Sequence, residues 1–205
     1  MFLHTALRDL EIAERAIDKM ASAEKFDVFY EAWQDFLYRI ERAWGFSERE
    51  LHHMGGFDAW FSPYAELRRK DPLLRFLRQA RHAETHAVSA TLDKPIELLF
   101  RDKFGRPFRV NDIKAEFKDG VLTINVDTPD KLHAYDVSVV PTNPKLLRFK
   151  NRGEWYNPPK SHLGNRTEDL HPIIAAKLGL DFYRTFVKEG IAKFDRTKRA
   201  PTRGI

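Results

Sequence analysis

Side chains that can act on phosphate groups are concentrated between residues 71 and 88. Arg81 and His86 are separated by four residues, and His82 follows Arg81 directly. A guanidinium can hold a phosphate through two parallel hydrogen bonds, and an imidazole titrates near neutral pH and can therefore transfer a proton. More arginines come shortly before this group: Arg68, Arg69, Arg75 and Arg78. Two interpretations follow, a face that binds anions and a basic face that water solvates.

The segment 71–88 is predicted to be one helix that positions these side chains. Asp71 can cap its beginning, and Pro72 suits the first helical position. At 3.6 residues per turn the apolar side chains gather on one side of this helix: Leu73, Phe76, Leu77, Ala80, Ala83 and Ala87. Glu84 falls on that side too, so we expect it to pair with a cation from a neighbouring helix or to be partly exposed.

Arg81 and His86 are about 140° apart around such a helix. This arc is too wide for a site within a single helix. It suits two copies of the helix packed across a two-fold axis, where each copy supplies an arginine and a histidine to a shared cleft. Leu74 lies within the arc and is predicted to give the contact some apolar area.

The segment DPLLRFLRQARHAETH resembles the HEPN superfamily, whose nuclease members carry an arginine, a polar residue and a histidine at this kind of spacing. The resemblance covers roughly residues 1–91. It implies an all-α bundle, a homodimer and metal-independent RNA cleavage in which the ribose 2′-hydroxyl attacks the adjacent phosphate. His86 would move a proton and Arg81 would stabilise charge on the phosphate. His82 stands where the family more often has Asn or Asp.

The same resemblance allows a catalytically silent module that binds RNA or a protein partner through the basic face. If the protein is a nuclease, the resemblance implies a role in a toxin–antitoxin system or in phage defence, and an antitoxin is one expected partner. Arg68, Arg69, Arg75 and Arg78 are the predicted nucleic-acid-binding residues in either case. These two readings use the same side chains, so the sequence separates them poorly.

No metal or cofactor is predicted. His82 and His86 have a spacing that can bind a divalent cation, but HAETH lacks the glutamate that directly follows the first histidine in zinc peptidases. No glycine-rich phosphate loop and no Ser-His-Asp arrangement is recognisable. The chain has no cysteine, which excludes thiolate catalysis and cysteine-based metal sites and fits a reducing cytoplasm.

The composition is that of a globular protein with a sizeable core. The chain has 205 residues, 42% of them hydrophobic, and a formal net charge of +5. A basic balance of this size permits nucleic-acid binding without requiring it. No apolar run approaches the roughly 20 residues that span a bilayer, so we expect a cytoplasmic protein that does not bind membranes.

The apolar spacing predicts helices on both sides of the arginine-rich segment. The first is expected over 4–20 and the second over 25–44, with Gly45 ending the second as a C-cap. Ser47 and Glu50 form a capping box that predicts a separate short helix to about Met54. The aromatic residues of 57–64 are predicted to form a loop that packs on the core rather than stacking bases, followed by a helical turn from Pro63 to Arg69. A further helix is expected over 172–194.

After Thr91 the apolar period changes from 3.6 to two, which predicts a small antiparallel β meander. Its clearest hairpin joins 113–117 to 122–126, and its last strand is expected over 132–140. Residues 141–170 are predicted to be an extended loop anchored by Trp155 and Tyr156. The predicted class is therefore α+β: a HEPN-like helical domain of 1–92 plus 171–195, a β insertion of 93–140, the loop 141–170 and a basic tail of 196–205.

Overall fold

The computed structural model describes residues 3–85, 89–93, 96–102, 104–108, 112–118, 121–127, 135–141 and 143–195. Within these ranges the helices are α1 (His4–Ala21), α2 (Phe26–Leu51), α3 (Phe57–Lys70), α4 (Pro72–Thr85) and α5 (Pro172–Phe194). The strands that the structure describes pair only antiparallel. The predicted α+β class is therefore confirmed. His86, Ala87 and the predicted tail 196–205 lie outside the described residues.

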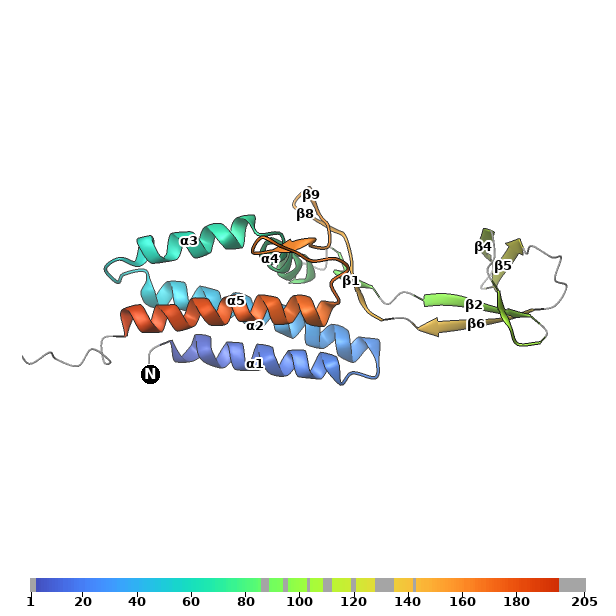
Figure 1. The fold of residues 1–205 in the computed structure, drawn as a ribbon, viewed down its shortest axis with the longest axis horizontal. Helices are drawn as coiled ribbons and strands as arrows, with labels where there is room; N and C mark the ends of the chain where they lie inside the picture. The colour runs from blue at the N-terminus through green and yellow to red at the C-terminus, as the bar shows by residue number, and fades with distance from the viewer. Residues whose placement is uncertain are drawn as a thin grey trace, which may run out of the picture. The chain divides into compact units, whose positions relative to one another are not determined.

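The chain divides into two compact units, Met1–Asp93 with Pro144–Ile205 and Lys94–Asn143. The larger unit holds all the described helices. Its core forms because the apolar stripes of α1, α2, α4 and α5 face one another, and α5 contacts each of the other three. Figure 1 shows α1, α2 and α5 lying side by side along much of their length. None of the described helices is long and apolar enough to cross a membrane.

The described strands of the smaller unit form two separate antiparallel sheets rather than the single predicted meander. β4 (Asp112–Lys118) and β5 (Val121–Asp127) form the predicted hairpin, with Ile113 opposite Val126 and Phe117 opposite Leu122. β2 (Ile96–Asp102), however, pairs with β3 (Pro107–Phe108) on one edge and with β6 (Tyr135–Pro141) on the other. The last strand thus returns beside the first, a long-range pairing that a local alternation pattern cannot specify. The predicted turns at 119–120 and 128–130 lie outside the described residues.

The segment predicted as an extended loop contains short strand pairs, so that prediction is wrong. β7 (Lys145–Leu146) pairs with β1 (Leu92–Asp93), β8 (Phe149–Asn151) with β9 (Glu154–Tyr156), and β10 (Ser161–His162) with β11 (Asn165–Arg166). Two of these pairs close through two-residue turns with positive φ at both positions, 48° and 86° at Arg152 and Gly153 and 47° and 82° at Leu163 and Gly164. These values are typical of type I′ hairpin turns.

α2 continues through the predicted C-cap at Gly45, so the two predicted helices are one. Ser47 does not cap a new helix, because its hydroxyl donates to the Ala43 carbonyl inside α2 at 2.8 Å. Trp44, Ser47 and Leu51 are all buried, which shows that the same face of the helix keeps facing the core. A single glycine costs a helix only about 1 kcal/mol, and this burial outweighs it.

Replacing Gly45 with alanine should raise the free energy of unfolding by about 0.5–1 kcal/mol, because glycine inside a helix costs that much relative to alanine. A Cβ atom at this position would have no tertiary neighbour within 4 Å. Urea denaturation measures the change. Gly179→Ala is the matched control in α5, where the new methyl group would collide with Leu77 Cδ1 and lower stability. Destabilisation by Gly45→Ala would contradict the expected result.

The aromatic stretch predicted as a loop forms the first half of α3. Phe57 and Trp60 are buried, and the Trp60 ring stacks on Phe186 of α5 with centroids 4.9 Å apart. Their packing on the core is therefore confirmed, but the loop and the later helix start are wrong. Pro63 lies inside the helix rather than at its beginning.

Candidate functional site

The beginning of α4 is fixed by Asp71, as predicted. Its Oδ1 accepts a hydrogen bond from the backbone N–H of Leu74 at 2.9 Å. The same carboxylate accepts from the Leu163 N–H at 2.6 Å and from His162 Nδ1 at 3.0 Å. Asp71 and His162 are both buried. One side chain therefore caps α4 and also holds the β10–β11 turn against it, a role of His162 that its sequence context does not reveal.

The apolar face of α4 packs as predicted. Its buried residues are Leu73, Leu74, Phe76, Leu77, Ala80 and Ala83. The burial of Leu74 corrects one expectation, since a fully buried leucine cannot give apolar area to a contact between two copies. The half-buried and exposed positions of α4 that remain are mostly polar or charged.

The end of α4 is held by Glu84, which is half-buried. Its carboxylate accepts hydrogen bonds from the Tyr30 hydroxyl at 2.6 Å and from Gln34 Nε2 at 2.8 Å. Thr91 adds two more, from its N–H at 2.9 Å and its hydroxyl at 2.6 Å. All these donors are uncharged, so Glu84 has no cationic partner among the described residues, and of the two expectations it is partial exposure that holds. This network joins α4 to α2 directly after the arginine-rich segment.

Arg81 is half-buried and faces α2. Its guanidinium carbon lies 5.2 Å from the centroid of the Tyr38 ring, and its Nε is buried without a hydrogen-bond partner among the described residues. Arg39 and Arg42 lie over the same ring, each at 5.4 Å. Those two are balanced by the buried carboxylate of Asp9, at 3.1 Å from each. Arg81 has no such carboxylate in the part of the chain that the structure describes.

His82 is also half-buried, and its surroundings favour the neutral imidazole. Burial lowers the pKa of His82; the Glu41 carboxylate opposes this shift, and the positive charges of Arg78, Arg152 and Arg81 add to it. The net effect holds the pKa below its ordinary value. The ring is therefore available at neutral pH to accept a proton or a hydrogen bond. Arg152, from the β8–β9 turn, was not predicted as a site residue.

The Glu41 carboxylate cannot fully neutralise the charges of the arginines that act on His82, because it already forms an ion pair with Arg68. Arg68 is buried, forms an ion pair with Glu41 and donates from Nε to the Tyr183 hydroxyl at 3.0 Å. Its guanidinium carbon lies 4.5 Å from the Trp44 ring centroid. This burial and pairing argue against the predicted nucleic-acid-binding role of Arg68. Arg68 continues the buried stripe of α3, four residues after Tyr64, and this spacing was the available signal.

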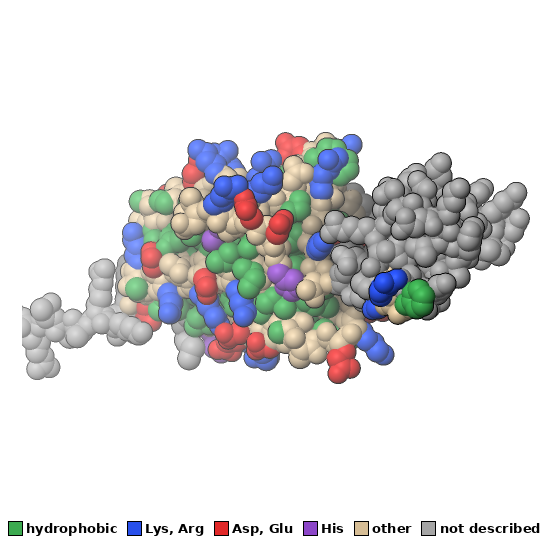
Figure 2. Space-filling model, turned by 45° about the vertical axis from the view of Figure 1, so that its right-hand side comes forward, with side chains coloured by type: hydrophobic (Ala, Val, Ile, Leu, Met, Phe, Trp, Pro, Cys, Tyr) green, Lys and Arg blue, Asp and Glu red, His purple; other side chains and the backbone are tan. Residues whose placement is uncertain are grey.

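The other predicted basic residues separate into paired and unpaired side chains. Arg69 is exposed and binds Glu66 through two nitrogens, at 3.0 and 2.8 Å. Arg75 pairs with Glu154 at 2.9 Å and lies over the Tyr156 ring. Arg78, by contrast, forms no ion pair with a described residue. Figure 2 shows basic and acidic side chains interspersed over the face in view.

We call Arg78, Arg81, His82 and Arg152 the α4 cluster. The positive charges of its three arginines all act on the His82 imidazole and favour its neutral form, and a group of guanidiniums suits an anion such as a phosphate group. His86 lies outside the described residues, so its geometry with Arg81 stays a prediction. Among the described residues no group of three His, Asp or Glu side chains could hold a metal ion. Comparisons with protein-family models, curated proteins and solved structures give no match.

Proposed function

We propose that this protein binds RNA at the α4 cluster and cleaves it without a metal ion, as the resemblance to HEPN nucleases implies. The observation that carries the proposal is Arg81. Its guanidinium is half-buried and has no carboxylate partner among the described residues, and the next residue is an imidazole whose pKa is lowered. A cation held this way loses little freedom when it binds a phosphate oxygen.

In the proposed step a neutral histidine removes the proton from a ribose 2′-hydroxyl. The O2′ atom then forms a bond to the adjacent phosphorus, and the bond from phosphorus to the O5′ of the next nucleotide breaks. A second group supplies the proton that O5′ takes up, so the products are a 2′,3′-cyclic phosphate and a 5′-hydroxyl. His82 and His86 are the proposed proton-transfer groups. Arg81 stabilises the charge that builds up on the phosphate oxygens.

A homodimer in which two copies of α4 share the cleft remains part of the proposal. Because Leu74 is buried, the contact between copies must rest largely on polar and charged side chains. Such a contact is sensitive to salt. Sedimentation at low and high ionic strength measures the oligomeric state directly.

The second candidate is an RNA-binding module that does not cleave. The α4 cluster contains a single imidazole, that of His82, whereas the cleavage step needs one proton removed and another supplied. Arg78 and Arg152 would serve binding equally well in both cases. An antitoxin or another protein partner at the same face would compete with RNA.

The test is cleavage of end-labelled RNA in the presence of EDTA, with Arg81→Ala, His82→Ala and His86→Ala as variants. We expect Arg81→Ala to cut at least about a hundredfold more slowly, because loss of one donor to a developing oxyanion typically costs that much. Arg15→Ala is the matched control, since that arginine is exposed on α1 and is not among the predicted binding residues. Product ends should be 2′,3′-cyclic phosphates.

Three outcomes would contradict metal-independent cleavage. If the wild-type protein cuts no faster than Arg81→Ala, the nuclease proposal fails. If that same pair differs in RNA affinity but neither cuts, the binding module replaces it. Cleavage that disappears in EDTA would also exclude the metal-independent step.

A further inference from the structure

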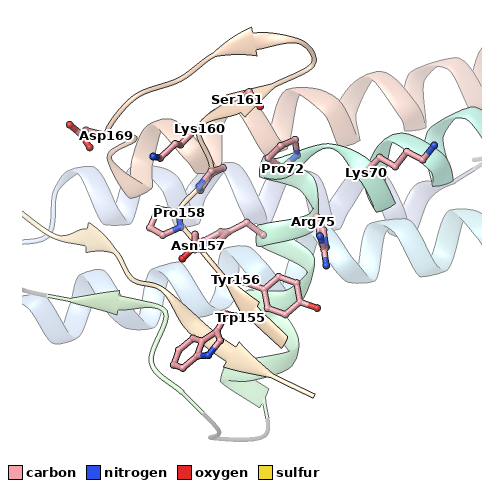
Figure 3. Close-up of a pocket in the computed structure, with 12 residues that line it drawn as sticks. Lys70, Pro72, Arg75, Trp155, Tyr156, Asn157, Pro158, Lys160, Ser161 and Asp169 are labelled. Atoms are coloured by element: carbon pink, nitrogen blue, oxygen red, sulfur yellow. The ribbon is translucent and has the colours of Figure 1, made fainter. Parts of the chain in front are cut away.

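A pocket of about 880 Å³ lies between the α3–α4 junction and the segment 155–161. Its lining includes Lys70, Arg75, Trp155, Tyr156, Lys160 and Asp169. In Figure 3 the side chains from Trp155 to Ser161 follow one wall, and Lys70 and Arg75 lie on the other side. The α4 cluster does not account for this pocket, because none of its residues lines it.

The β8–β9 hairpin presents an exposed indole at one edge of the pocket. Trp155 is 54% exposed, so the prediction that it anchors this segment is wrong. The inner face of the hairpin does the anchoring: Phe149 packs edge-on against Phe76 of α4 with centroids 5.2 Å apart, and the Tyr156 ring stacks on Phe149. Asn151 adds a hydrogen bond to Gln79 at 2.8 Å. A rigid hairpin therefore holds the indole out in solvent.

Cations surround this indole on its exposed side. The Arg148 guanidinium carbon lies 3.9 Å from the Trp155 ring centroid, which fixes the indole by a cation–π contact. Lys150 is the direct cross-strand partner of Trp155, so both side chains project from the same face of the hairpin. Arg148, Lys150 and Lys160 are exposed, and none forms an ion pair with another residue that the structure describes. Lys70 and Arg75, in contrast, are paired with Glu66 and Glu154.

We propose that unpaired RNA binds at the edge of this pocket, along the exposed side of the β8–β9 hairpin, with bases stacked on Trp155. Its phosphates would be held by Lys160, which lines the pocket, and by Arg148 and Lys150, which lie beside Trp155 outside the lining. Proteins bind single-stranded nucleic acids with aromatic rings beside a row of cations, because every base has a π-face that can stack and every phosphodiester linkage carries a negative charge. A duplex offers no free base face to the indole. The choice of RNA as the nucleic acid rests on the proposed function, but the pocket and its residues do not.

Binding can be measured without cleavage by using a fluorescein-labelled 2′-O-methyl oligoadenylate, which lacks the attacking hydroxyl. Three of the four tryptophans are buried, Trp33, Trp44 and Trp60, so contact quenching of tryptophan emission by the same oligonucleotide without its fluorescein reports mainly on Trp155. We expect quenching by the single strand and little by a hairpin duplex of the same length. Equal quenching by both would overturn the proposal.

Variants separate the stacking part from the charge part. Trp155→Ala should weaken binding about tenfold, the typical effect of removing one stacking ring, while Trp155→Phe should retain most of the affinity. Changing Arg148, Lys150 and Lys160 to glutamine should reduce the slope of log affinity against log salt by about two, since each phosphate contact contributes roughly 0.7 for a single strand. Unchanged affinity in Trp155→Ala, with the fold intact by circular dichroism, would overturn the proposal.

The two proposals fail independently. If the 2′-O-methyl oligonucleotide binds in a way that depends on Trp155 but ordinary RNA is not cleaved, the nuclease proposal is overturned and the proposal of RNA binding at Trp155 is supported. If cleavage depends on Arg81 and Trp155→Ala has the same KM as the wild type, the proposal of RNA binding at Trp155 is overturned and the nuclease proposal is supported. Capture of anionic vesicles or an acidic peptide in place of the oligonucleotide would also overturn the assignment to RNA.

Discussion

Replacing Arg68 with alanine is expected to lower the free energy of unfolding by about 3–5 kcal/mol, the usual cost of removing one partner from a buried ion pair. The Glu41 carboxylate would be left partly buried without its cation, and the Tyr183 hydroxyl would lose the Arg68 Nε–H. The contact with the Trp44 ring would disappear as well. These losses affect α2, α3 and α5 together, so the effect should be global.

Guanidinium chloride denaturation followed by far-ultraviolet circular dichroism measures this change. Arg69→Ala is a close control, because the next residue along the same helix is also an arginine with a glutamate partner but is exposed. An exposed pair contributes only about 0–1 kcal/mol. The expectation is contradicted if the two variants have the same midpoint.

The neighbouring arginines also illustrate what the sequence could and could not predict. Arg68 and Arg69 look alike in a run of basic residues, and only the helical continuation of the stripe through Tyr64 distinguishes the buried one. That stripe was obscured because Pro63 suggested that a helix begins there. Pro63 instead lies within α3, where the aromatic packing of Phe57 and Trp60 stabilises the helix around it.

The helices of the larger unit follow from apolar spacing, and the cap at Asp71 follows from a residue type with a local partner. The hairpins of 149–166 do not, because their type I′ turns carry Arg-Gly and Leu-Gly instead of the usual Asn-Gly. The return of β6 beside β2 depends on residues about 40 positions apart. Nothing within either strand specifies that pairing.

Within the candidate site, Arg81 and His82 could be grouped from the sequence because they are neighbours in the chain. It could not place Tyr38 under Arg81 or Arg152 near His82, since these come from α2 and from a distant turn. Nor could it show which cations are already paired. Because the other predicted arginines are buried or paired, the candidate site that we retain is the α4 cluster.

The second large effect is expected at Asp71, where alanine should lower the free energy of unfolding by about 3–4 kcal/mol. Leu74 and Leu163 would each keep an N–H without its acceptor, and the buried ring of His162 would lose its partner. Unsatisfied buried donors cost about 1–3 kcal/mol each, and loss of a helix cap about 1 kcal/mol. Urea denaturation at neutral pH measures the total.

The same side chain should make stability depend on acid. Burial raises the pKa of Asp71, but the hydrogen bonds from His162, Leu74 and Leu163 lower it more, so the net pKa is below its ordinary value of 3.8. A carboxylate whose pKa is lower in the folded than in the unfolded state stabilises the fold above the unfolded pKa. This contribution is lost as the pH falls from about 4 through the lower pKa of the folded state.

Asp71→Asn tests the charge separately from the shape, because the amide oxygen can still accept the bond from Leu74. We expect this variant to be less stable than the wild type at pH 7 and to lose less stability between pH 5 and pH 3, on the order of the difference in proton binding that Asp71 contributes. Asp58→Asn is a suitable control, since that aspartate lies exposed in the first turn of α3. If the stability of the wild type and of Asp71→Asn falls by the same amount between pH 5 and pH 3, another carboxylate governs the acid response. The Asp71 side chain would then stabilise the contact between α4 and the β10–β11 turn through its hydrogen bonds alone.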